Sequence, residues 1–219
     1  MTGRGTPDAT GIGRLIVSDA CVAEGAAWLA AREPRFAAAL DRTGPLPLRL
    51  RPDGFAALFS AIVSQQVSVA SGAAIWARLD GAGLTAPDRI RGATDDDLRT
   101  AGLSRQKIRY ARALADARLP YDALRHRPTD EVIATLTEVP GIGRWTAEIY
   151  AMFSLGRADV FAPADLALQE AARSIFELDA RPSERALRDR ADAWSPWRGV
   201  AARLLWAHYA VEKAREGVR

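Results

Sequence analysis

The stretch that points most directly to chemistry is Pro140-Gly141-Ile142-Gly143, which lies between two segments with helical hydrophobic patterns. We expect one helix to end before it and another to begin after it, because both glycines permit positive φ angles and let a second backbone approach closely. The second helix would start with N–H groups that lack intrahelical partners and with the positive end of its dipole, which together bind an anion. Ile142 can fill the space between the helices. If the segment were only a turn between two helices, the glycines would be needed for the backbone geometry alone. The full sequence of residues 136–147, with a helix on each side, favours instead a site that binds one phosphate of DNA.

A carboxylate, Asp165, follows Pro163 soon after this hairpin and lies near the expected start of another helix. An aspartate in such a place accepts hydrogen bonds from the first N–H groups of the helix, and composition alone favours this capping role. The residue types therefore predict a capping aspartate, and a catalytic role for it needs further support.

The composition suits a globular protein and excludes several kinds of metal site. The 219 residues carry a net charge of +3 and are 48% hydrophobic, which is enough for one domain or two small lobes. Cys21 is the only cysteine, which excludes a disulfide framework and any iron–sulfur or cysteine-based zinc site within the chain. His126 and His208 lack ligand spacing, so we expect a structural role for each.

No apolar run approaches the ~20 residues that span a bilayer, and residues 1–13 resemble a loose tail rather than a signal peptide. We therefore expect a cytoplasmic protein without a membrane partner.

Arginine supplies almost all of the positive charge, because Lys107 and Lys213 are the only lysines. Arginine binds phosphate through a planar, bidentate contact, although GC-rich genomes also favour it. The charge thus permits nucleic-acid binding without demonstrating it.

Helical periodicity dominates the chain. One buried helix face is expected over residues 55–63, with Asp53 as its N-cap, and Ser195 and Pro196 are expected to open the last long helix. Strand patterns are nearly absent, and the proline-bounded residues 45–52 suit a connector. The predicted fold class is all-α, with many short helices.

Five blocks of this sequence, in order, resemble the HhH-GPD superfamily of DNA glycosylases, and within it the 3-methyladenine DNA glycosylase II group. They are residues 62–68, 102–107, 136–147, 159–165 and 194–198. The resemblance implies a helix-hairpin-helix glycosylase fold of two helical lobes with the active site in the cleft between them. We expect one lobe over residues 14–50 plus 156–219, the hairpin-bearing lobe over residues 51–155, and a disordered tail over residues 1–13.

The resemblance also implies how the hairpin meets double-stranded DNA. The positions that match its DNA contacts are Gly141, Gly143, Arg144 and Thr146. Backbone carbonyls there hold a monovalent cation, Na⁺ or K⁺, that bridges to a phosphate. Those carbonyls belong to Thr137, Val139 and Ile142.

Asp165 matches the catalytic aspartate of the family. Breaking an N-glycosidic bond leaves positive charge near C1′, which a fixed carboxylate stabilises while it orients or deprotonates the attacking water. A base alkylated at N3 or N7 is already cationic and leaves as a neutral species, so one carboxylate suffices. The family often carries an acidic residue where this sequence has Ala164, so Asp165 has to cap its helix and catalyse at once.

A flipped base needs a flat apolar slot, and an indole face also attracts a cation. The resemblance places Trp145 and Trp206 in that pocket, with Tyr150 and Phe161 as weaker candidates, and core packing is the alternative for each aromatic residue. The remaining tryptophans expected in the core are Trp76, Trp194 and Trp197. The loop that contains Gln65 and Gln66 matches the wedge that fills the hole in the duplex, with Gln66 as the inserted side chain; a polar turn is the alternative.

Relatives that also cut the strand carry a lysine at the position of Trp145, which forms a Schiff base with the sugar. The sequence therefore implies a monofunctional, monomeric glycosylase of base excision repair that acts on alkylated purines in nucleoid DNA. No cofactor is required, and the iron–sulfur branch is excluded. The alternatives are a helix-hairpin-helix DNA-binding protein without catalysis, a glycosylase of the same fold for a uracil, oxidised-guanine, other deaminated or etheno base, and a purely structural helical protein.

Overall fold

The computed structural model describes residues 11–216, and these residues form thirteen α-helices and one 3₁₀ helix without any β-strand. The predicted all-α class is confirmed. Within the described range, no helix combines the length and the apolar character that crossing a membrane requires.

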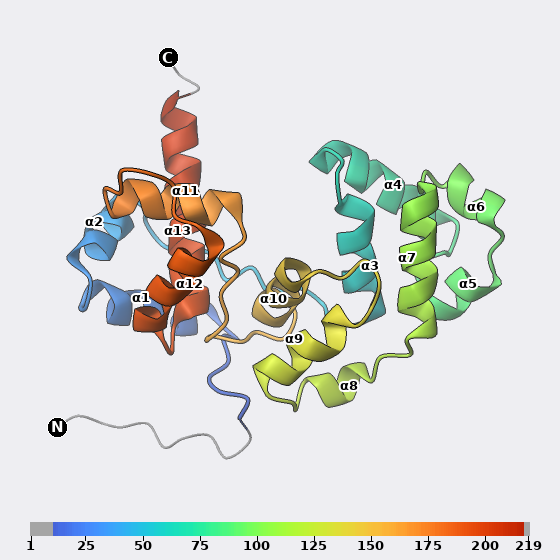
Figure 1. Cartoon of the computed structure of the whole chain (residues 1–219), viewed down its shortest axis with the longest axis horizontal. Helices are drawn as coiled ribbons and strands as arrows, with labels where there is room; N and C mark the ends of the chain where they lie inside the picture. Colours follow the sequence, from blue (N-terminus) through green and yellow to red (C-terminus); the bar gives the residue numbers. More distant parts are fainter. Residues whose placement is uncertain (1–10, 217–219) are drawn as a thin grey trace. The chain divides into compact units, whose positions relative to one another are not determined.

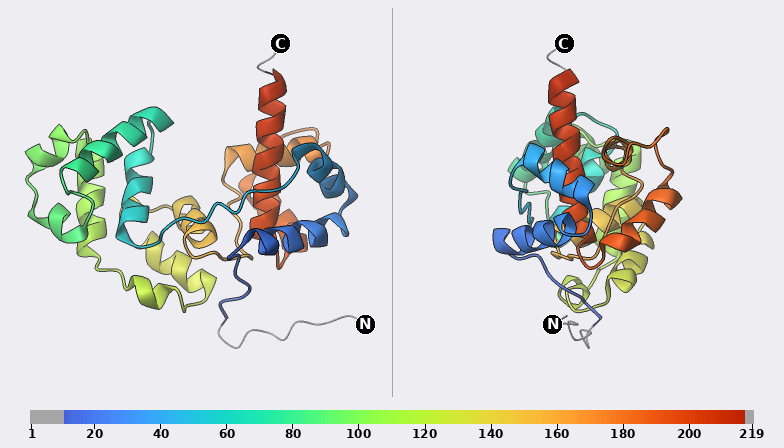
Figure 2. Two further views of the ribbon diagram at one scale, coloured as in Figure 1. Left: turned by 180° about the vertical axis from the view of Figure 1, so that it is seen from behind. Right: turned by 90° about the vertical axis from the view of Figure 1, so that its left-hand side faces the viewer.

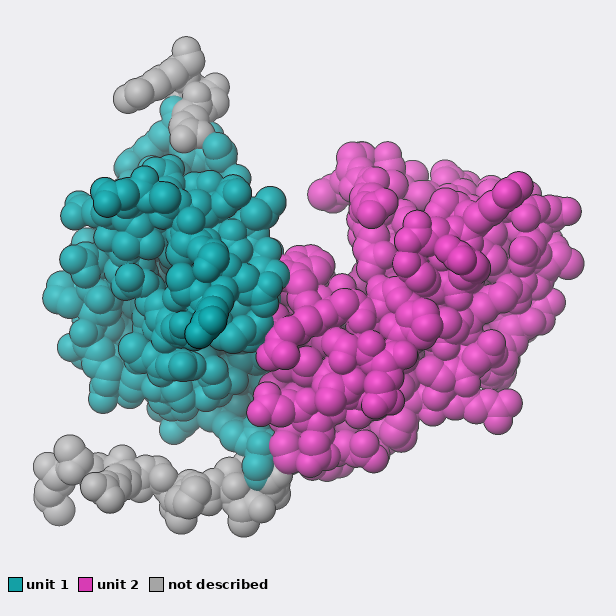
Figure 3. Space-filling model, viewed as in Figure 1, with its two compact units in different colours: residues 1–50, 151–219 teal, residues 51–150 magenta. Residues whose placement is uncertain are grey.

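The chain divides into two compact units, which Figure 3 colours separately. Unit 1 contains residues 1–50 and 151–219, and unit 2 contains residues 51–150. The second boundary therefore falls inside helix α10, Arg144–Phe153, and not at residue 155 as the sequence suggested. The helix is continuous, so its two ends contribute to different units.

The expected tail over residues 1–13 lies for the most part outside the described residues. Its last part is bonded to unit 1, because the carbonyl of Ile12 accepts a hydrogen bond from Arg157 at 3.0 Å. Just after it, Ile16 donates its N–H to Gly156 at 2.7 Å and is fully buried. Ile16 therefore anchors the segment before the first helix in the core of unit 1.

The helices of unit 1 gather around the long C-terminal helix α13, as the views in Figures 1 and 2 agree. These helices are α1 (Asp19–Ala30), α2 (Pro34–Thr43), α11 (Leu166–Ile175), α12 (Glu184–Ala191), η1 (Asp192–Trp194) and α13 (Arg198–Glu216). The predicted core tryptophans Trp194 and Trp197 are 5% and 2% exposed. Gly25 lets α1 approach Trp197, because a Cβ at this position would lie 2.7 Å from the indole ring.

The last helix does not begin where the sequence suggested. Ser195 ends the 3₁₀ helix, and α13 starts at Arg198. The hydroxyl of Ser195 donates to Asp159 at 2.8 Å, so it is engaged away from the helix start. The predicted cap formed by Ser195 and Pro196 is wrong.

The helices of unit 2 are α3 (Phe55–Ser64), α4 (Val69–Gly81), α5 (Pro87–Gly92), α6 (Asp95–Thr100), α7 (Arg105–Asp116), α8 (Tyr121–Leu124), α9 (Thr129–Thr137) and the first part of α10. Among them, α3 and α7 pack against each other, α4 packs against α3, and α5 and α6 pack against α7. The predicted buried face of α3 is confirmed. Its predicted cap is wrong, because Gly54 occupies the N-cap position and Asp53 forms an ion pair with Arg125 at 2.6 Å.

Candidate functional site

The predicted helix-hairpin-helix is present in unit 2, formed by α9, residues 138–143 and α10. The turn is closed by a hydrogen bond from the N–H of Ile142 to the carbonyl of Val139, at 3.0 Å. Ile142 is 3% exposed, as expected of a side chain that fills the space between the two helices. At the start of α10, the N–H of Ala147 donates to the carbonyl of Gly143 at 3.0 Å. The backbone N–H groups of the residues before Ala147 therefore belong to the N-terminal end of the helix.

Gly141 is the position at which this turn requires glycine. Its φ angle is +96°, and a Cβ there would lie 2.4 Å from the ring of Tyr110. The side-chain amide of Gln65 donates to the carbonyl of Gly141 at 3.0 Å. Gln65 therefore supports the hairpin from the loop between α3 and α4.

Gly143 has a different role, because it does not adopt the positive φ angle that a glycine permits. Apart from Gly143 itself and its two neighbours in the chain, no atom of the described residues lies within 4 Å of the place where its Cβ would be. The backbone before α10 is therefore open on this side, where an added side chain would stand in the way of an approaching group.

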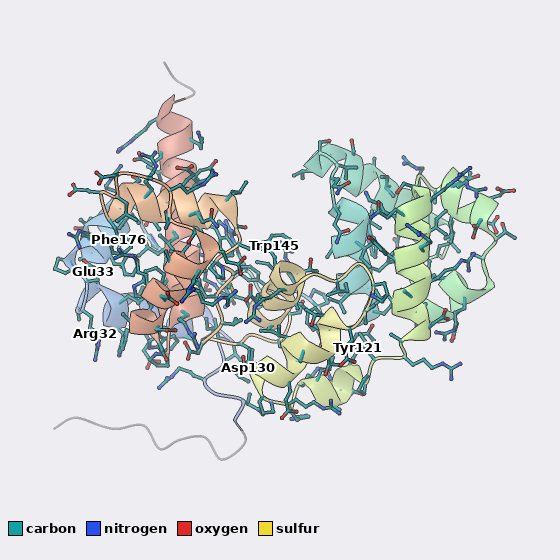
Figure 4. All side chains as sticks on the ribbon, viewed as in Figure 1. Arg32, Glu33, Tyr121, Asp130, Trp145 and Phe176 are labelled. Atoms are coloured by element: carbon teal, nitrogen blue, oxygen red, sulfur yellow. The ribbon has the colours of Figure 1, made fainter. Side chains whose placement is uncertain are left out.

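The first turn of α10 carries three side chains with different exposure. Arg144 is half exposed and donates from its Nε to Glu148 at 3.0 Å, and the Glu148 side chain is 1% exposed. Trp145, labelled on α10 in Figure 4, is 42% exposed. Thr146 is only 6% exposed, so its side chain is not a surface DNA contact, and its backbone N–H is the group that α10 can offer there.

The loop between α3 and α4 contains the predicted wedge. Gln66 is exposed and has a φ angle of +57°, an uncommon conformation for a residue with a side chain. Beside it, Val69 is 92% exposed at the start of α4. Lys107 holds the end of α3 next to this loop, because its Nζ donates to the carbonyl of Val63 at 2.7 Å. Burial lowers the pKa of Lys107.

Asp165 lies in unit 1 as the N-cap of α11, so the capping role predicted from its position is confirmed. Its Oδ1 accepts hydrogen bonds from the N–H groups of Ala167 at 3.0 Å and Leu168 at 3.1 Å. The same oxygen accepts a third bond, from the indole Nε1 of Trp206 at 3.2 Å. The carboxylate is thus held by two helices, α11 and α13, and remains half-buried.

Trp206 is itself held in place by an aromatic neighbour. Its ring lies 5.6 Å from the ring of Phe153, centroid to centroid, at 35°. The buried guanidinium of Arg203 sits over Phe153 at 4.8 Å and donates to the carbonyls of Leu48 and Gly199. Burial lowers the pKa of Arg203 to about 10, which keeps it charged at neutral pH.

The two weaker pocket candidates are packing residues. Phe161 is 5% exposed, and its ring lies edge-on to Trp194 at 5.3 Å. Tyr150 is 4% exposed, and its hydroxyl accepts the N–H of Gly54 at 2.9 Å. Burial raises the pKa of Tyr150 to about 12, so its hydroxyl stays neutral.

The structure thus gathers the sequence-predicted residues into two groups. Gln65 and the hairpin are joined in unit 2, and Asp165 and Trp206 are joined in unit 1. The role of Lys107 in holding the carbonyl of Val63 was not predicted from the sequence. Two features of the sequence could have indicated it: Lys107 is one of only two lysines, and it stands next to the apolar residues of α7. The cleft between the lobes stays a prediction.

The described residues thus form an all-α protein with a helix-hairpin-helix in one unit and, in the other, a carboxylate that is hydrogen-bonded by two helices. Residues 59–196 match the family model described as HhH-GPD superfamily base excision DNA repair protein, and the chain belongs to this superfamily.

Solved structures and curated relatives agree with this family. A DNA-3-methyladenine glycosidase of Bacillus halodurans has a TM-score of 0.77 and 32% identity, over 85% of this chain and 89% of that one. The 3-methyladenine DNA glycosylase of Schizosaccharomyces pombe, solved in complex with abasic DNA, has a TM-score of 0.75 and 27% identity, over 84% and 95%. The Bacillus subtilis protein YfjP is 32% identical over 124 residues, which are 55% of this chain and 43% of that relative's length. The chain therefore spans less than half of that relative.

Proposed function

We propose that this protein is a monofunctional DNA glycosylase of base excision repair. It flips an alkylated purine, 3-methyladenine or 7-methylguanine, out of double-stranded DNA and hydrolyses the N-glycosidic bond to leave an abasic site. The observation that carries the proposal is the Asp165 carboxylate, fixed by α11 and by Trp206 in a chain of this superfamily. The names of the Bacillus halodurans and Schizosaccharomyces pombe proteins mention 3-methyladenine and support that purine as a substrate.

The reaction needs one fixed negative charge. As the C1′–N bond breaks, its electron pair moves to the base and positive charge develops at C1′. The carboxylate of Asp165 stabilises this charge, and its fixed geometry requires no rearrangement during the reaction. A water molecule then bonds to C1′, and its proton passes to Asp165 and on to solvent. A cationic base takes the electron pair and leaves neutral, so no general acid is required.

Hydrolysis by water is the favoured route because neither lysine is placed for a Schiff base. The position that matches the lysine of strand-cutting relatives is Trp145. Lys107 is buried and bonded to the carbonyl of Val63, and Lys213 lies near the end of α13. We therefore expect the DNA strand to stay intact.

The hairpin provides the contact to the DNA backbone. The start of α10, where backbone N–H groups and the positive end of the helix dipole lie, would bind one phosphate beside the open position at Gly143. The carbonyls of Thr137, Val139 and Ile142 would hold a Na⁺ or K⁺ ion.

The residues of the turn fit such an ion. The Val139 carbonyl accepts one hydrogen bond, from Ile142, and a carbonyl oxygen has a second lone pair. The hydroxyl of Thr137 bonds back to Ile133 at 2.9 Å, so Thr137 would contribute its carbonyl. When bound, the ion would neutralise phosphate charge.

The substrate class is tested by comparing lesions under single-turnover conditions at saturating enzyme. We expect faster release of N7-methylguanine than of hypoxanthine or uracil in the same sequence context, after correction for spontaneous loss. Indole faces favour a cation by about 0.5–2 kcal/mol, which corresponds to about 2- to 30-fold in rate. Equal or larger enhancement for the uncharged bases would contradict the alkylated-purine assignment and favour a pocket that recognises bases by hydrogen bonds.

A further inference from the structure

A groove of about 330 Å³ runs between α11 and α13 in unit 1. Its walls include Leu166 and Arg173 from α11, Tyr209 and Lys213 from α13, and Arg181 from the segment after α11. No residue of this groove took part in the chemistry proposed above.

The rim of the groove carries more positive than negative charge. Three cationic side chains, Arg173, Arg181 and Lys213, face two carboxylates, Glu170 and Glu212. Glu170 lies between the two arginines, 2.9 Å from the Nε of Arg173 and 3.2 Å from the Nη1 of Arg181. Each arginine side chain is about half exposed and has five N–H donors, so donors remain for a further acceptor. A planar guanidinium matches two oxygens of a phosphate.

A buried polar group lies at the floor of the groove. His208 is 1% exposed, and its Nε2 is 3.0 Å from the hydroxyl of Ser174. Within the described residues, its Nδ1 has no hydrogen-bond partner. Burial lowers the pKa of His208, so the ring is neutral at neutral pH. The floor of the groove is thus polar without adding charge of its own.

The groove lies beside the carboxylate site and is formed by the same two helices. Asp165 caps α11 and is bonded to Trp206 on α13, while the next residue, Leu166, is 61% exposed and lines the groove. Arg173 lies eight residues beyond Asp165, about 12 Å along the axis at the rise of an α-helix. Each strand of a duplex carries one negative charge per about 3.4 Å of its axis. A strand that places a nucleotide at Asp165 therefore has neighbouring phosphates within reach of this rim.

We propose that the groove between α11 and α13 binds backbone phosphate of the DNA strand, next to the nucleotide held at Asp165. Arg173, Arg181 and Lys213 supply the contacts, and this site is separate from the hairpin because the hairpin belongs to the other unit. The proposal rests on the proposed function, since it takes Asp165 as the place where the target nucleotide lies.

The test is the salt dependence of binding to a duplex with a stable abasic-site analogue, measured by fluorescence anisotropy. The variant is Arg181→Gln with Lys213→Gln, and the matched control is Arg32→Gln with Arg188→Gln. The control removes the same charge from unit 1 outside the groove. The groove variant should bind about tenfold more weakly, and the slope of log affinity against log salt should become shallower by about 1 to 2, since each lost phosphate contact contributes about 0.9.

The control should keep the slope of the unchanged protein. Equal changes in both double variants would overturn the proposal, because net charge alone would then explain them, and so would an unchanged slope in the groove variant. Base release is measured in parallel. If the unchanged protein releases base and the slope of the groove variant is unaltered, only the groove proposal is refuted. If the slope of the groove variant is shallower but the unchanged protein releases no base, the glycosylase function is refuted and the groove remains a DNA contact.

Discussion

Replacing Asp165 by asparagine is expected to slow single-turnover base release by at least about 100-fold, because it removes the charge that stabilises the developing cation at C1′. The substitution is well suited to this test. Asparagine caps helices as well as aspartate does, so its side-chain oxygen can still accept the N–H groups of Ala167 and Leu168. DNA binding and the thermal midpoint should therefore remain close to those of the unchanged protein.

A rate within tenfold of the unchanged protein would show that Asp165 is a helix cap and not the catalytic carboxylate. Trp206→Phe is the companion variant, because it keeps an aromatic ring beside Phe153 and removes the N–H that donates to Asp165. A lost hydrogen bond to a charged group should reduce the rate by about tenfold while affinity for abasic DNA is unchanged. A core position such as Trp197, changed to phenylalanine, should affect stability instead.

Replacing Gly143 by aspartate is expected to weaken binding to lesion-bearing and undamaged duplexes alike, by about 10- to 100-fold. The added carboxylate would stand before the start of α10, where it would occupy the anion site and repel phosphate. The range corresponds to losing a hydrogen bond to a charged group, about 1.5–3 kcal/mol. Equilibrium binding at fixed salt to the two duplexes measures the effect.

The matched control is Gly143→Ala, which adds a methyl group without charge. Because the space beside Gly143 is open and its φ angle is ordinary, this variant should fold and bind nearly as the unchanged protein does. Loss of affinity for lesion DNA alone in Gly143→Asp would mean that the hairpin reads the base, which contradicts the phosphate account. Gly141 is unsuitable for this experiment, since any side chain there would collide with Tyr110.

Local patterns were sufficient to predict the elements that depend on nearby residues. The buried face of α3 follows from helical periodicity, and the hairpin follows from the glycines and the helices on either side of it. The capping role of Asp165 needs only its own side chain and the next three residues, which is why its place in the chain predicted it.

Contacts between distant residues could not be predicted in this way. Asp53 and Ser195 are typical caps by residue type, yet each bonds elsewhere, to Arg125 and to Asp159. Nothing in the residue types indicates that Gln65 and Gly141 are hydrogen-bonded to each other. The same is true of the hydrogen bond between Trp206 and Asp165. These bonds depend on how the helices pack, which a sequence pattern does not encode.

Incubation of the purified protein with a duplex containing one N7-methylguanine tests directly whether this chain is a monofunctional glycosylase. We expect free base in excess of spontaneous loss, a strand that stays intact until alkali is added, and no covalent adduct after borohydride reduction. Binding of the duplex without release of base would contradict the claim and indicate a DNA-binding protein without catalysis, and a strong borohydride-trapped adduct would show that an amine of the protein attacks the sugar.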